Sequence, residues 1–189
     1  MTMIDEAIYF VTDAMSGKTR KGDGAPAVFH SLEAGAIASS LTHDEEIISA
    51  VLLHDVIEDA GVTADELREK FGDRVTKLVL AGSENKRHGI PPAESWKIRK
   101  EEEIKILEDT QDIGVKILFL ADKLSNLRSV AAGLEKKGEG YWQNFNQKDP
   151  KEHYWYYSEI GKSLNVLQGT PELKEYNRLL KTVFEGETR

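Results

Sequence analysis

Four ionisable side chains fall within six consecutive residues in the first third of the chain. His54 and Asp55 are adjacent, and Glu58 and Asp59 follow four residues after each of them. At about 100° per residue, a helix would place all four side chains within one arc of about 140°. Imidazole and carboxylate groups are natural ligands for divalent cations. The spacing therefore points to metal chemistry.

The residues that precede this group support a bound cation. Residues 47–53 are apolar apart from Ser49, which predicts a buried helix. Burying one histidine and three carboxylates without partners would cost several kcal/mol per charge, and a cation would offset that cost. The alternative is a helix end with solvated acids, because Asp59 is followed by Ala60 and Gly61, a common stop signal.

Two further segments carry isolated candidate ligands. The apolar stretch 115–121 leads into Asp122, and Asn126 follows four residues later on the same predicted helix face. His30 comes after a turn-rich loop over 16–26. Taken singly, Asp122 reads as a salt-bridged core acid and His30 as an ordinary histidine.

Helical periodicity dominates the segments that must position these side chains. The sequence predicts a single all-α domain over 1–189, with its core at about 5–183 and about eight to ten helices in a bundle. Asp44 is a plausible N-cap, and Thr63 with Glu66 has capping-box spacing. The expected helices span about 4–15, 30–41, 44–59, 63–70, 73–82, 93–109, 112–135, 149–168 and 171–184.

Composition narrows the class of protein. The chain has 189 residues, a formal charge of −8 and no cysteine, so it has no disulfides or thiolate ligands. The acidity argues against binding to nucleic acid or an anionic membrane, and an anionic substrate would need a local basic cluster. The acidic N-terminus lacks the features of a secretory signal, and the apolar runs are too short to span a bilayer. We expect a cytoplasmic protein.

Taken together, these motifs resemble the HD phosphohydrolase superfamily. His30, the His54-Asp55 pair and Asp122 match its H…HD…D pattern. More narrowly, the chain resembles the small RelA/SpoT-type alarmone hydrolases, such as the metazoan SpoT homologues, over about residues 5–183. The stretches that carry this resemblance are Arg20-Lys21-Gly22, His54-Asp55-Val56-Ile57-Glu58-Asp59, Phe71-Gly72, Glu84-Asn85-Lys86-Arg87, Trp96-Lys97-Ile98-Arg99-Lys100 and Leu120-Ala121-Asp122-Lys123-Leu124-Ser125-Asn126-Leu127-Arg128.

The resemblance implies a metal-dependent hydrolase. Its members hold one Mn²⁺ per chain, with ligands that match His30, His54, Asp55 and Asp122. Their Glu-Asp pair, here Glu58 and Asp59, orients and activates the attacking water. The implied reaction removes the 3′-pyrophosphate of ppGpp or pppGpp and leaves GDP or GTP.

The resemblance also implies which residues contact the nucleotide. Arg20 and Lys21 would lie against the base, with Asn126 and a tyrosine of the next-to-last helix lining the pocket. Tyr156 is the best match for that tyrosine, and Tyr154 and Tyr157 are the alternatives. Basic residues that would meet the phosphates are Lys86, Arg87 and Arg128. The ordinary reading of each of these basic residues is a solvated surface charge.

One departure and two alternatives bear on the substrate. The family's Pro-Tyr-x-x-His-Pro pattern is here Pro26-Ala27-Val28-Phe29-His30-Ser31, so the ligand is kept while the tyrosine and second proline are lost. One alternative is a nucleotide or NADPH phosphatase of the same superfamily. The other is a catalytically dead module that senses an alarmone, although Glu58 and Asp59 are both present. The sequence indicates no oligomeric state.

Overall fold

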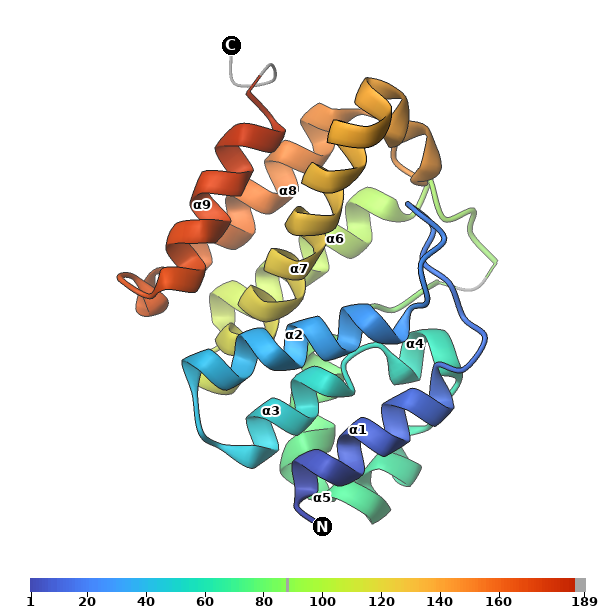
Figure 1. The fold of residues 1–189 in the computed structure, drawn as a ribbon, viewed down its shortest axis with the longest axis vertical. Helices are drawn as coiled ribbons and strands as arrows, with labels where there is room; N and C mark the ends of the chain where they lie inside the picture. Colours follow the sequence, from blue (N-terminus) through green and yellow to red (C-terminus); the bar gives the residue numbers. More distant parts are fainter. Residues whose placement is uncertain (88, 186–189) are drawn as a thin grey trace.

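Apart from one isolated bridge, helices are the regular structure of residues 1–87 and 89–185, the part of the chain that this computed structural model describes (Figure 1). The predicted all-α class is confirmed. The helices are α1 (Met3–Ala14), α2 (Val28–Leu41), α3 (Glu45–Leu52), α4 (Val56–Ala60), α5 (Ala64–Gly82), α6 (Trp96–Asp109), α7 (Ile113–Lys137), α8 (Pro150–Ser163) and α9 (Pro171–Val183), with the short 3₁₀ helices η1 (Gly138–Asn144) and η2 (Asn165–Leu167).

Side-chain caps fix two helix starts where the sequence predicts them. Asp44 accepts hydrogen bonds from the amides of Glu46 and Ile47 at the start of α3. Thr63 and Glu66 form a reciprocal capping box at the start of α5. These bonds satisfy amides that have no partner within the helix.

The single helix expected over 44–59 is wrong, because the chain breaks at the histidine. α3 ends at Leu52, and α4 begins only at Val56. The carbonyl of Val51 would normally accept from the amide of Asp55, but here it accepts from the ring Nδ1 of His54 at 2.7 Å. A side chain that takes a backbone partner in this way competes with the helix. The arc calculated for a continuous helix therefore does not describe the site.

A second break does lie where the sequence places it. The expected division between 63–70 and 73–82 falls at Gly72, whose φ of 84° interrupts α5. A left-handed φ is costly for residues with a Cβ and is accessible to glycine. The two parts of α5 thus run in different directions around one glycine.

α7 is the central element of the bundle. It packs against α2, α3, α5 and α9, and its apolar side chains from Val115 to Leu127 are buried. In Figure 1, α1, α3 and α5 gather at the N-terminal end of the molecule, while α8 and α9 lie at the other end. Burial of each large aliphatic side chain contributes about 1.5–3 kcal/mol, so α7 anchors both ends.

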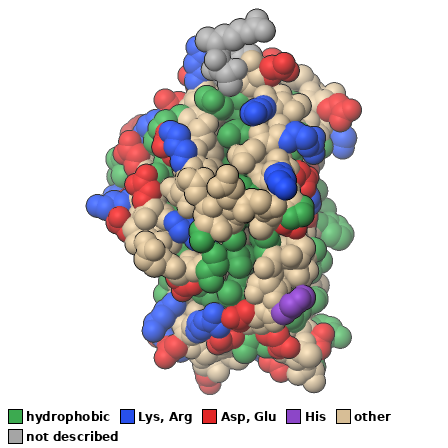
Figure 2. All heavy atoms as spheres, turned by 90° about the vertical axis from the view of Figure 1, so that its left-hand side faces the viewer, with side chains coloured by type: hydrophobic (Ala, Val, Ile, Leu, Met, Phe, Trp, Pro, Cys, Tyr) green, Lys and Arg blue, Asp and Glu red, His purple; other side chains and the backbone are tan. Residues whose placement is uncertain are grey.

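The surface mixes both signs of charge. On the face that includes α9, acidic and basic side chains are interspersed around an apolar strip (Figure 2). None of the described helices has the length and apolar character needed to cross a membrane.

Candidate active site

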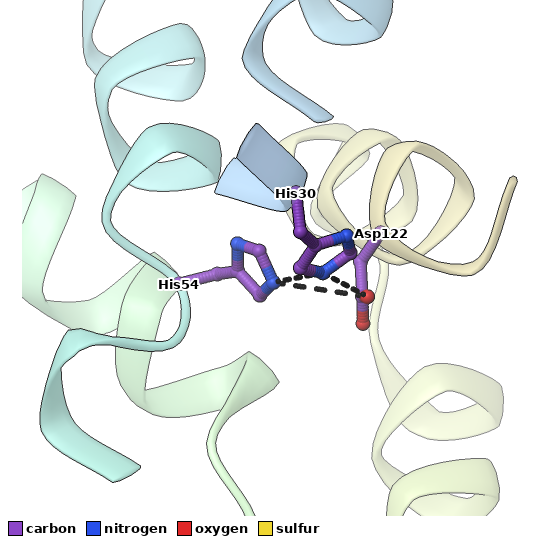
Figure 3. A group of neighbouring side chains, drawn as sticks. All are labelled: His30, His54 and Asp122. Atoms are coloured by element: carbon purple, nitrogen blue, oxygen red, sulfur yellow. Dashed lines mark hydrogen bonds and ion pairs between the residues drawn. The ribbon is translucent and has the colours of Figure 1, made fainter. Parts of the chain in front are cut away.

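Three buried side chains from distant parts of the sequence point their ligand atoms at one another (Figure 3). His30 lies in the first turn of α2, His54 in the turn between α3 and α4, and Asp122 in the middle of α7. Nε2 of His30 is 3.1 Å from Nε2 of His54 and 3.2 Å from Oδ1 of Asp122. Asp55 approaches from the side, its Oδ2 3.3 Å from Nε2 of His54.

The hydrogen bond that each histidine makes through Nδ1 determines whether its Nε2 can act as a metal ligand. Nδ1 of His54 donates to the carbonyl of Val51, and Nδ1 of His30 is 2.8 Å from the hydroxyl of Ser125. With Nδ1 carrying the hydrogen, each neutral ring presents a bare Nε2. Two nitrogen lone pairs and the Asp122 carboxylate therefore converge, and they need a positive charge between them. The residues fit a divalent cation.

Without a metal, a proton partly meets this need. Burial acts to lower the pKa of His54, but the neighbouring Asp55 and Asp122 carboxylates outweigh it and raise the pKa to about 9. Burial likewise acts to raise the pKa of Asp55, and the two histidines hold it below its usual range. The cluster therefore favours a positive charge, supplied either by a proton on His54 or by a bound metal ion.

Asp122 is oriented by two neighbours on its own helix. Nδ2 of Asn126 donates to Oδ1 of Asp122 at 2.6 Å, and Nζ of Lys123 lies 2.7 Å from Oδ2. Lys123 is itself buried and is held on its other side by Glu103 at 3.3 Å. Burial lowers the pKa of Lys123, but Asp122 and Glu103 outweigh that effect and keep the amine charged.

A cavity of about 570 Å³ opens over this cluster. His30, Asp55 and Asp122 lie on its lining, while His54 sits deeper and is only 2% exposed. The other predicted site residues on the lining are Arg20, Lys21, Glu58, Asp59, Lys86 and Asn126. The volume is of the size that takes a small-molecule ligand.

Glu58 and Asp59 stand on one side of the cavity, in α4. Glu58 accepts from the amide of Glu84 at 2.5 Å and from Lys86 at 2.8 Å, and Asp59 lies 3.3 Å from the same lysine. Burial raises the pKa of the Glu58 carboxyl, and the Lys86 ion pair opposes that rise. A carboxylate whose pKa is raised is better suited to accept a proton near neutral pH.

The basic loop before α2 also lines the cavity. An isolated bridge between Thr19 and Pro26 closes the loop, and the amide of Arg20 donates to the carbonyl of Ala25. This closure folds the loop back over the cluster, where the Arg20 guanidinium donates to Oδ1 of Asn126 at 2.7 Å. Asn126 thereby joins Arg20 to Asp122.

Three residues expected at the substrate lie elsewhere. Tyr156 is buried behind the cavity with its hydroxyl donating to Glu103, and the neighbouring Tyr157 lines the cavity in its place. Arg87 is ion-paired with Glu102 on the outer side of α6. Arg128 points away from the cavity and pairs with two carboxylates, because α7 turns its side chain toward α2 and α9.

The sequence did not lead us to a group of largely buried charges on the cavity lining. Lys123, Lys100, Glu84 and Glu103 all line the cavity. Lys100 pairs with both glutamates, and Arg99 pairs with Glu84. Lys123 stands beside Asp122 at the end of the largely apolar stretch 115–121, and that position is the signal available in the sequence.

The family follows from comparison with known proteins. A model of the HD domain matches residues 7–145, which include all four predicted metal ligands. The chain belongs to the HD domain family. A guanosine-3′,5′-bis(diphosphate) 3′-pyrophosphohydrolase from Aquifex aeolicus is 29% identical to this HD domain over 160 residues, which cover 85% of the chain and 21% of that protein. The chain spans about a fifth of the length of the curated relatives it matches.

Two solved structures share the fold of this HD domain. A Listeria monocytogenes protein is 32% identical with a TM-score of 0.72, over 82% of this chain and 99% of that one. A metazoan ortholog of SpoT that hydrolyzes ppGpp has a TM-score of 0.74 at 23% identity, over 98% of this chain and 96% of that one.

Proposed function

We propose that this chain is a manganese-dependent hydrolase that removes the 3′-pyrophosphate of ppGpp and pppGpp. The observation that carries the proposal is that one cavity brings together the histidine–aspartate cluster, the Glu58-Asp59 pair and the Arg20-Lys21 loop. Curated relatives named for this hydrolysis match 85% and 64% of the chain.

His30, His54, Asp55 and Asp122 would hold the metal. Mixed nitrogen and oxygen ligands, with no thiolate in the sequence, suit Mn²⁺. A divalent cation held there supplies a Lewis acid and makes a water molecule more acidic. We propose one such ion per chain.

The carboxylates of α4 would manage the proton. Glu58 accepts a proton from the attacking water, and Asp59 helps to orient that water in line with the scissile bond. The bond between the ribose O3′ and the adjacent phosphorus breaks, and the water oxygen leaves in pyrophosphate. The O3′ atom receives a proton and stays on GDP or GTP.

The basic loop before α2, together with other residues on the cavity lining, would hold the nucleotide. The planar guanidinium of Arg20 is suited to stacking on a base, and Lys21 adds charge beside it. Asn126 and Tyr157 also line the cavity, and we infer that they contact the ribose and base. Lys86, Lys100 and Lys123 also line the cavity, each in an ion pair with neighbouring carboxylates, and they would place ammonium groups beside the phosphates.

A nucleotide panel tests the proposal against its alternatives. Mn²⁺-loaded protein is incubated with ppGpp, pppGpp, GTP, dGMP and NADPH, and phosphate and pyrophosphate are measured separately. We expect turnover of the first two with release of pyrophosphate, and at most slow turnover of NADPH. Hydrolysis of GTP or dGMP with ppGpp left intact would instead indicate a general nucleotidase. Binding of ppGpp without turnover would indicate a sensor.

A further inference from the structure

The far side of the His30 ring is held by a buried hydroxyl. Nδ1 of His30 lies 2.8 Å from Oγ of Ser125, which stands on α7 three residues after Asp122 and is fully buried. Since Nε2 of His30 faces the ligand cluster, Nδ1 carries the hydrogen and donates it to Ser125. The Ser125 hydroxyl hydrogen is then free to point elsewhere.

The Ser125 hydroxyl continues the chain of hydrogen bonds toward the protein surface. Its Oγ donates to Oε2 of Glu33 at 2.6 Å, and Nη1 of Arg128 donates to the other Glu33 oxygen at 3.0 Å. Arg128 also donates two hydrogen bonds, of 2.9 and 2.7 Å, to Glu175 of α9. One unbroken chain of hydrogen bonds thus runs from His30 to α9.

The two histidines differ in how they are supported. His54 is held by the backbone carbonyl of Val51, which substitution of a side chain cannot remove. His30 depends on the side chain of Ser125 and, through it, on those of Glu33 and Arg128. Outer partners of this kind fix the orientation of a ligating imidazole and raise its basicity.

We propose that Ser125, Glu33 and Arg128 are positioning residues that set the affinity of the site for its metal through His30. Arg128 acts on the metal site through Glu33 and Ser125, and it does not contact the substrate. The inference rests on the metal site of the proposed function, but it does not depend on which nucleotide is hydrolysed.

The first test measures Mn²⁺ binding to chelator-treated protein by calorimetry. Ser125→Ala should weaken binding by roughly 10- to 100-fold, the range typical of outer partners of metal ligands. Ser49→Ala is the matched control, because Ser49 is equally buried and its hydroxyl has no hydrogen-bond partner. Its Mn²⁺ affinity should equal that of the wild type. Equal affinities for Ser125→Ala and the wild type would overturn the proposal.

The second test asks whether Arg128 acts through Ser125. Arg128→Gln should weaken Mn²⁺ binding in the wild type and add no further loss in the Ser125→Ala background. The same loss in both backgrounds, or a raised KM for ppGpp with unchanged Mn²⁺ affinity, would contradict the relay. Glu33 is partly exposed, so we expect the Glu33→Gln variant to fold. This variant should weaken Mn²⁺ binding even if Ser125→Ala does not fold. Because the readout is metal binding, these results stand apart from the outcome of the nucleotide panel.

Discussion

His54 and His30 turn bare ring nitrogens toward Asp122, and their remaining ring hydrogens are committed to Val51 and Ser125. Because these acceptor atoms converge, the His54-Asp55 pair can form a metal site together with His30 and Asp122, which are distant from it in the sequence. It also explains the raised pKa of His54, since a proton on its ring relieves the same repulsion when no metal is bound.

Removal of one ring from the cluster should remove the metal. His54→Ala takes away a nitrogen that the other ligands cannot replace, and we expect the purified variant to retain no stoichiometric Mn²⁺ by elemental analysis. His43→Ala, which alters an exposed histidine before α3, should keep full occupancy. A His54→Ala protein as fully loaded as the wild type would show that the ligand assignment is wrong.

Glu58→Gln should separate turnover from metal binding. Its carboxylate lies on the cavity lining and would accept the proton of the attacking water, so the amide should lower kcat by roughly 10²- to 10⁴-fold. Mn²⁺ content should stay at the wild-type level. Glu69→Gln, an exposed site on α5, serves as the control. Full activity of a metal-replete Glu58→Gln enzyme would exclude this role.

At the scale of elements, the turn between α3 and α4 is what the sequence could not show. Apolar residues continue at helical spacing from Ile47 to Ile57, and no glycine or proline lies between them. The interruption arises because the His54 ring takes the Val51 carbonyl, a contact visible only in three dimensions. By contrast, the break at Gly72 and the caps at Asp44 and Thr63 depend on local chemistry, and the sequence predicts them.

The junction of α7 and η1 offers a test of packing next to the cavity. A Cβ at Gly133 would enter the ring of Tyr141, which lines the cavity. Alanine normally stabilises a helix interior relative to glycine, but overpacking costs about 1–3 kcal/mol. We expect Gly133→Ala to lower the free energy of unfolding in denaturant and to raise KM for the nucleotide.

Gly140 provides the matched control for that substitution. A Cβ there meets nothing within 4 Å, so Gly140→Ala should leave both stability and KM close to the wild type. If Gly133→Ala is as stable as Gly140→Ala, the close approach of η1 to α7 does not constrain this side of the cavity.

At the scale of the whole molecule, the sequence predicts the helical class and most of the residues that line the cavity. It does not predict the direction in which each side chain points. Tyr156 and Tyr157 are adjacent on α8, and only the packing shows that the second reaches the cavity. Arg128 is turned away by Glu33 and Glu175, which lie far from it in the sequence. Long-range ion pairs of this kind leave no local pattern.

The stability of the fold should depend on pH through His153 of α8. Burial lowers the pKa of this histidine below its ordinary value of 6.5, Lys100 adds to that effect, and the carbonyl of Gln147, Asp149 and Glu152 oppose it. The unfolded chain therefore binds the proton more readily, and stability should fall as pH drops below about 6.5 toward the lowered pKa.

Thermal unfolding between pH 7.5 and 5.5 checks this expectation. His153→Gln keeps a donor for the Gln147 carbonyl but does not titrate, so its melting temperature should fall less over this range than that of the wild type. Equal slopes for the two proteins would show that His153 does not contribute.

The products formed from ppGpp distinguish hydrolysis of the 3′-pyrophosphate from other phosphatase activities. We would follow ppGpp by phosphorus NMR with Mn²⁺-loaded protein and with the same protein after chelator treatment. We expect one GDP and one intact pyrophosphate for each ppGpp consumed, and no turnover after the metal is removed. Stepwise release of two orthophosphates, or equal turnover without metal, would contradict the proposed function.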